Sequence, residues 1–95
     1  MATYRRTHTP GSKKTSTANQ VIDFYNYEMS PPENCKVQFL HFQTFAQDVN
    51  IKINDEPVVH WIEANSERVF QDIDIDKITI VNAGAEYYYT AMSVE

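Results

Sequence analysis

Residues 48–54 read Asp-Val-Asn-Ile-Lys-Ile-Asn, and this stretch decides the fold class. Val49, Ile51 and Ile53 occupy every second position, and polar side chains fill the positions between them. Side chains of a β-strand point alternately to its two faces, so this pattern indicates a strand with one buried and one exposed face. The polar residues 54–57 (Asn-Asp-Glu-Pro) follow directly and predict a turn.

Segments of the same kind flank this strand on both sides. They cover residues 21–27, 37–42, 58–62, 68–73, 77–82 and 87–94. Isoleucine and valine total 16 residues, whereas leucine occurs only at Leu40, which is typical of pleated sheets rather than helices. About seven strands at roughly ten-residue spacing predict an all-β domain, either a small antiparallel β-sandwich or a partly open barrel.

The charged residues divide the chain into two parts. The first 14 of the 95 residues hold four bases, Arg5, Arg6, Lys13 and Lys14, and no acid, which gives +4. The other four of the eight bases and all 13 acids lie beyond residue 14, so that part carries −9 and the whole chain −5. Because the start of the chain is also poor in apolar residues, we expect residues 1–20 to form an extended basic arm and residues 21–95 the β-sandwich domain.

Several classes of protein do not fit this composition. No apolar run approaches the ~18 residues of a transmembrane helix, so we expect no membrane association. No apolar segment follows the N-terminal charges, so the start does not read as a secretory signal. Cys35 is the single cysteine, which excludes an internal disulfide and a multi-cysteine metal site.

Asp72, Asp74 and Asp76 form a conspicuous string of alternate carboxylates. Carboxylates on one face of a strand can bind a hard cation, but the glycine and the loop residues of a calcium loop are missing here. The simpler interpretation places Ile73 and Ile75 in the core and the three acids in water.

His41, His60 and Cys35 are the remaining candidates for metal or nucleophile chemistry. Their spacing matches neither a zinc finger nor a metalloenzyme helix, and strand histidines are usually packing or surface residues. Cys35 follows a proline-rich segment and has no glycine-rich elbow or neighbouring base to activate it. We therefore expect no enzyme activity, no cofactor and no metal site.

The expected partner-binding residues fall into an aromatic group and a basic group. Trp61, Tyr87 and Tyr89 are the aromatic candidates, because Tyr87 and Tyr89 share one strand face and Tyr88 the other. Arg5, Arg6, Lys13 and Lys14 are the basic candidates. The basic segment can be a disordered tail, bind nucleic acid or bind a protein, and the acidic body favours an acidic protein surface over nucleic acid.

Four features of residues 49–94 carry a resemblance to known proteins. They are an Ile-x-Ile-Asn strand end (51–54), the segment from Ala to Phe at 64–70, an Asp-Ile-x-Ile-x-x-Ile-x-Ile segment (72–80), and an Asn-x-Gly turn (82–84) before a tyrosine-rich last strand. Over this half of the chain, the sequence resembles small β-sandwich virion proteins of tailed bacteriophages. These include capsid decoration (cement) proteins, head fibres and small tail components.

The resemblance implies a structural component of a virion, assembled in the host cytoplasm. The favoured hypothesis is a capsid decoration protein that binds the major capsid protein and neighbouring copies through its N-terminal arm, as a homo-oligomer or as lattice-arrayed copies. The alternative is a ligand- or receptor-binding module of a head fibre or tail, with Trp61 and the tyrosines as its platform. A metal-dependent or thiol enzyme is the third alternative.

Overall fold

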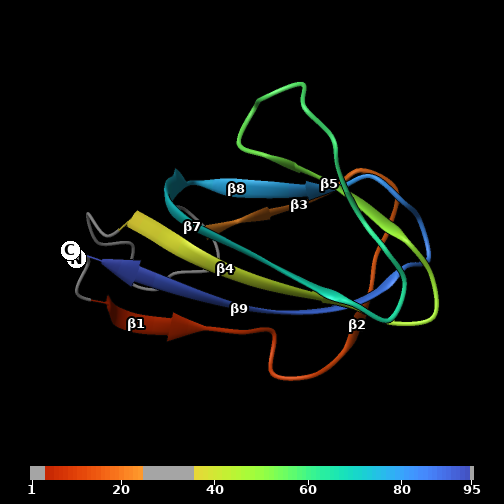
Figure 1. Ribbon diagram of the computed structural model, residues 1–95, viewed down its shortest axis with the longest axis horizontal. Helices are drawn as coiled ribbons and strands as arrows, with labels where there is room; N and C mark the ends of the chain where they lie inside the picture. Colours follow the sequence, from red (N-terminus) through yellow and green to blue (C-terminus); the bar gives the residue numbers. More distant parts are fainter. Residues whose placement is uncertain (1–3, 25–35, 95) are drawn as a thin grey trace.

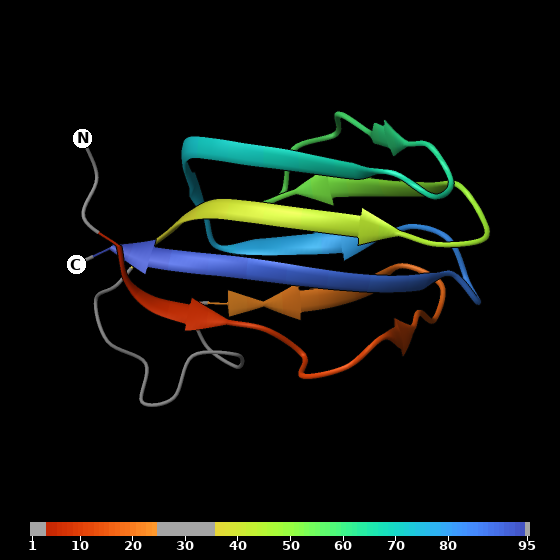
Figure 2. The same ribbon diagram turned by 60° about the horizontal axis from the view of Figure 1, so that its bottom comes forward.

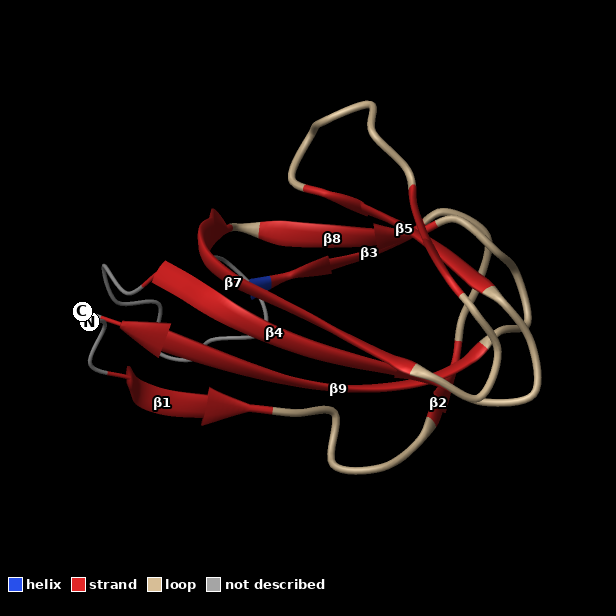
Figure 3. Cartoon of the chain, in the orientation of Figure 1, coloured by secondary structure: helices blue, strands red, loops and turns tan. Residues whose placement is uncertain are grey.

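The structure is a computed structural model that describes residues 4–24 and 36–94. Nine β-strands run through the described residues (Figure 1): β1 Tyr4–His8, β2 Lys14–Thr15, β3 Gln20–Asp23, β4 Lys36–Thr44, β5 Val49–Ile53, β6 His60–Ile62, β7 Glu67–Ile75, β8 Lys77–Ile80 and β9 Glu86–Val94. Every segment expected to form a strand contains one, although residues 25–27 of the first segment lie outside the described part of the chain. Loops and turns join the strands mainly at the ends of the molecule (Figure 3).

The strands form two antiparallel sheets. The first sheet has the order β1-β9-β4-β7, with β2 also paired to β9, and the second has the order β3-β8-β5-β6. The two sheets lie as layers, with β1 and β3 on one side of the molecule and β7 and β6 on the other (Figure 2). The predicted small antiparallel β-sandwich is confirmed.

The strand pairings follow a nested order along the chain. β5 pairs with β6, β4 with β7, β3 with β8 and β1 with β9, as in one long hairpin whose two arms run side by side. Two further pairings, β9 with β4 and β8 with β5, join the parts of this folded hairpin into sheets. This is the connectivity of a jelly roll, an architecture that recurs in viral capsid, lectin and cupin domains without defining one function.

The core lies between the sheets and is built from the alternate side chains of the inner strands. Val49, Ile51 and Ile53 of β5 are buried, as their alternation predicts. The other buried apolar residues are Ile22, Phe24, Val37, Leu40, Phe42, Ile62, Ile75, Ile78, Ile80, Ala85, Tyr87, Tyr89 and Ala91. Burying each large side chain stabilises a fold by about 1.5–3 kcal/mol relative to leaving it exposed, so this layer supplies most of the stabilisation.

Residues expected to form an arm outside the domain contribute strands to the first sheet. β1 and β2 both pair with the same edge of β9, whereas composition predicts a separate arm over residues 1–20. Ser16 then joins the chain to the turn before β9, because its N–H donates to Ala85 O and its hydroxyl donates to Asn82 O. An edge strand is held by backbone hydrogen bonds and needs few buried side chains, so low apolar content does not exclude one.

The pairing between β4 and β7 contains an irregularity. β4 advances two residues between Val37 and Phe39, while the paired β7 advances four between Ile75 and Gln71. Asp72 lies in this bulge with a φ of 63°, a left-handed conformation that Asp tolerates better than most residues. The regular pairing of β7 is therefore confined to its first five residues, Glu67–Gln71.

The bulge corrects the expected burial of β7. Ile73 was expected in the core beside Ile75, but it is 42% exposed, whereas Ile75 is 2% exposed. The extra residues of the bulge shift the alternation, so Ile73 turns away from the opposite sheet. The Gln38 side chain bridges the irregularity by donating a hydrogen bond of 2.6 Å to Asp74 Oδ1.

Candidate interaction surfaces

Trp61 is the largest side chain that the fold leaves exposed and fixes in place. It lies in β6 and is 56% exposed, whereas the next residue, Ile62, is buried. Its indole N–H donates to Asp48 Oδ2 at 3.1 Å, and Asp48 Oδ1 accepts a 2.8 Å bond from the backbone N–H of Ala64. Asp48 therefore holds the indole and the turn after β6 together. A large ring held in this way loses little conformational entropy on binding a partner.

Further exposed apolar residues lie close to Trp61 in the sequence and on the neighbouring edge strand. Val58 and Val59 precede β6, and Val69 lies on β7. The side-chain Nη1 of Arg68 donates a 3.4 Å bond to the backbone oxygen of Trp61, which connects the two edge strands. On the inner side of these strands, the rings of His60 and Phe70 meet edge to face with centroids 5.2 Å apart. On the side of the sandwich formed by β6 and β7, His60 and Phe70 therefore pack against each other on the inside, and apolar side chains are exposed on the outside.

The basic residues lie on the opposite side of the sandwich (Figure 2). Arg5 and Arg6 are in β1, and Lys14 is an exposed residue of β2 paired with Tyr87. Lys13 forms an ion pair with Glu86 at 2.8 Å, and its ammonium lies 5.1 Å from the centroid of the Phe45 ring. The structure therefore does not bring the basic group and Trp61 together into one site.

Tyr87 and Tyr89 are placed differently from expectation. Both were expected at a partner-binding surface, but they are 3% and 2% exposed, and their rings stack with centroids 6.3 Å apart inside the sandwich. Gln20 donates a 3.1 Å bond to the Tyr87 hydroxyl, and Phe24 packs edge to face on Tyr89. The half-buried Tyr88 takes the outward position. The alternation along the strand was right, but the two faces were assigned in reverse.

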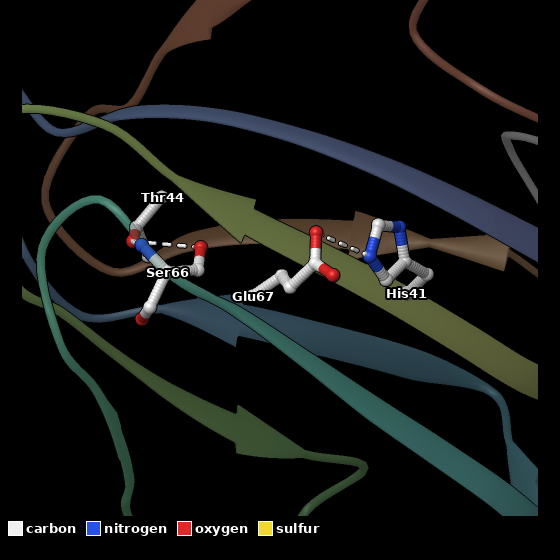
Figure 4. A network of polar contacts seen from close by, with 4 residues as sticks. All are labelled: His41, Thr44, Ser66 and Glu67. Carbon is white, nitrogen blue, oxygen red and sulfur yellow. Dashed lines mark hydrogen bonds and ion pairs between the residues drawn. The ribbon is translucent and has the colours of Figure 1, made fainter.

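A polar network joins β4 to the start of β7 (Figure 4). The buried Thr44 hydroxyl accepts a 3.0 Å bond from the Ser66 N–H, and its own N–H donates to Ser66 O at 2.9 Å. Three residues before Thr44 on β4, His41 Nε2 lies 3.1 Å from Glu67 Oε2. His41 and Glu67 lie on the paired strands β4 and β7, and Ser66 lies in the turn just before β7, so the network holds these segments together.

The other polar candidates do not converge. Within residues 4–24 and 36–94, no group of three or more His, Cys, Asp or Glu side chains is arranged to hold a metal ion. His60 packs on Phe70, and Cys35 lies outside the described residues. The Asp76 N–H and the Asp74 carbonyl both bond to the side chain of Asn54, so the end of β7 is held by the turn after β5.

The charge environment of Lys77 shifts the pKa of its ammonium. Its ammonium lies 2.9 Å from Asp55 Oδ1. The hydrogen bond and the charge of Asp55 raise the pKa of Lys77 above its ordinary value of 10.5, with smaller contributions from the charges of Asp23 and Asp76. The pair closes the turns at one end of the second sheet.

Comparison with known proteins gives no relative: the sequence matches no family model and no curated protein, and the structure matches no solved structure. None of the described segments forms a helix of the length and apolar character needed to cross a membrane.

Sequence reasoning missed the outer edge of β7 as a candidate surface. Val69 is 48% exposed there, and within the described residues β7 pairs only with β4. The available signal was the composition of residues 67–73, in which apolar and charged side chains do not alternate as they do in residues 48–54. A strand without clear alternation often lies at a sheet edge, where neither face is deeply buried.

Proposed function

We propose that the chain is a structural protein of a bacteriophage particle, namely a capsid decoration protein that binds the major capsid protein. The observation that carries the proposal is Trp61, which is more than half exposed while Asp48 holds its indole. Tryptophans of this kind are the common anchors of protein interfaces, because they bury a large area at low entropic cost. The capsid lattice would multiply such contacts, so each single contact need not be strong.

Two further features support this function. The jelly-roll connectivity is frequent among viral capsid proteins, which is an association with the fold rather than with a site. The acidic body, with its charge of −9 beyond residue 14, disfavours binding to nucleic acid and leaves a protein as the favoured partner. Trp61 and the exposed Val58 and Val59 before β6 are the proposed contact with the capsid.

The experiment begins with purified particles of a phage that encodes this sequence. Mass spectrometry is expected to find the chain in the particles, and its absence would overturn the proposal. Particles stripped of the chain are then incubated with recombinant protein. Trp61→Ala is expected to reduce occupancy about tenfold or more, since an anchor residue contributes at least ~1.4 kcal/mol. Tyr88→Ala, which removes a half-buried aromatic residue from the other sheet, is the matched control and is expected to keep wild-type occupancy.

The same tryptophan also supports the second candidate function, a ligand- or receptor-binding module of a head fibre or tail. An exposed ring beside a carboxylate, such as Trp61 beside Asp48, is suited to stacking on a sugar. The carboxylate can at the same time accept hydrogen bonds from the hydroxyl groups of the sugar. Saturable binding of the isolated protein to host surface glycans, lost in Trp61→Ala, together with unchanged capsid occupancy, would favour this function over decoration.

A further inference from the structure

The first sheet ends in two different strands, and each has an outer edge that no described strand pairs with. β1 forms one end and β7 the other in the order β1-β9-β4-β7. Figure 2 shows the two strands on opposite sides of the molecule. The outer N–H and C=O groups of an edge strand are ready to pair with another chain, so each edge is a potential docking site.

The directions of the two edge strands match each other. Every pairing in the sheet is antiparallel, so β1 and β4 run one way while β9 and β7 run the other. If β1 of one copy lay beside β7 of another, the two strands would be antiparallel and the alternation of the sheet would continue. β1 has five residues, but its pairing with β9 shifts register between Tyr4 and Arg6, so its regular part is Arg6–His8. The regular part of β7, Glu67–Gln71, is long enough to pair with these three residues. The bulge at Asp72 limits pairing to that part.

The charges of the two edges are also opposite. The segment that contains β1 and β2 holds four bases and no acid. Residues 67–76 hold the base Arg68 and four acids, Glu67, Asp72, Asp74 and Asp76. Lys13, Asp74 and Glu67 already bond to Glu86, Gln38 and His41 of their own chain. The main contribution therefore comes from the arginines of β1 and from Asp72 and Asp76, which follow the Glu67–Gln71 part of β7. Opposite charges across a strand pair stabilise it, and like charges destabilise it.

We propose that a second copy of this chain docks head to tail, with β1 of one copy pairing with the Glu67–Gln71 part of β7 in the next. The contact extends the first sheet from copy to copy and covers Val69, which is exposed in the single chain. Because the two edges differ, the interface is heterologous, and it generates a row or a closed ring rather than a symmetric dimer. Trp61 takes no part, because it lies on the other sheet.

Sedimentation velocity of the full chain tests this contact. The wild-type protein is expected to associate with rising concentration, and less so at high salt, because screening weakens the charge attraction. Arg5→Glu with Arg6→Glu reverses the charge of the β1 edge, and Val69→Lys places a cation on the β7 edge. Each variant is expected to associate at least about tenfold more weakly than wild type, since like charges then oppose each other across the contact.

Two controls and a mixture make the test specific. Lys52→Glu and Val21→Lys change the charge of residues on the second sheet and are expected to leave association unchanged. A 1:1 mixture of the two edge variants is expected to associate again, because each supplies the edge that the other has lost. Circular dichroism and a thermal melt verify that each variant is folded before it is compared.

A wild-type protein that stays monomeric at all concentrations would overturn the contact. Association that survives in either edge variant would also overturn it, because it indicates a symmetric contact through the other edge. A mixture of the two variants that stays monomeric would overturn it as well. None of these measurements uses particles, so a monomer that still binds capsids would remove the head-to-tail contact and leave the proposed decoration function standing.

Discussion

Strands β9 and β7 have the same length and belong to the same sheet, yet they differ in almost every other respect. Each has nine residues. β9 lies inside the sheet, between β1 and β4, and its described side chains alternate between buried and partly exposed from Glu86 to Ser93. β7 lies at the edge, and Ile75 is its only buried residue.

The difference shows that pairing on both sides, rather than composition, keeps the alternation of a strand regular. β9 pairs with β4 from Tyr87 to Val94 on one side, and on the other side with β2 at Glu86 and Tyr87 and with β1 from Ala91 to Val94. β7 has one neighbour and contains a bulge, so its isoleucines do not share one environment. A regular inner strand contributes to the core, whereas an irregular edge strand is left with side chains and backbone groups that can contact another molecule.

The largest expected effect tests β9 as the source of core stability. Tyr89→Ala removes a buried ring that packs on Phe24 and Tyr87, and we expect a loss of about 3–5 kcal/mol in the free energy of unfolding. Tyr88→Ala, one residue away on the outer face, is expected to cost about 1 kcal/mol or less. Urea denaturation of both variants measures the difference. Equal losses would mean that the two faces of β9 are assigned wrongly.

The next effect tests the bulge of β7. Ile75→Ala is expected to cost about 2–5 kcal/mol, because it leaves a cavity between the sheets. Ile73→Ala removes the same atoms from an exposed position, and we expect a loss within about 1 kcal/mol. If thermal melts showed similar losses for both, then the alternation would run through Asp72 unbroken, and the contrast between the two strands would disappear.

The sequence predicts regular strands well because one periodic rule governs them. Val49, Ile51 and Ile53 are buried as expected, and all seven expected segments contain strands. The same rule fails at Ile73, because a bulge depends on how two strands meet rather than on either strand alone. Tyr87 and Tyr89 were assigned to the wrong face, because Tyr87-Tyr88-Tyr89 offers the same side chain at alternating positions and so does not show which face is buried.

The candidate surfaces were predicted only in part, for a related reason. Trp61 was identified as a partner-binding candidate from its residue type, and the structure adds the hydrogen bond from its indole to Asp48. The pairing of β1 with β9 joins residues that are 83 to 90 positions apart, as in His8 with Ala91 and Tyr4 with Val94, and no local pattern in the basic N-terminal segment signals it. Contacts between distant segments, such as this strand pairing, are set by the tertiary fold and cannot be read from local sequence.

The smallest expected effect tests how the end of β7 is held. There, side chains of the turn after β5, Asn54 and Asp55, contact Asp74, Asp76 and Lys77 in place of strand pairing. Because the pKa of Lys77 is raised in the folded state, the ion pair with Asp55 stabilises the fold at pH values below 10.5. This contribution is lost as the pH rises through the folded-state pKa. We therefore expect the stability difference between wild type and Asp55→Asn to be constant from neutral pH up to 10.5, to decline above that pH, and to vanish above the folded-state pKa. Urea midpoints of both proteins across this range measure it. A difference that persists at the highest pH would show that Asp55 holds the turn by its backbone geometry rather than by its charge.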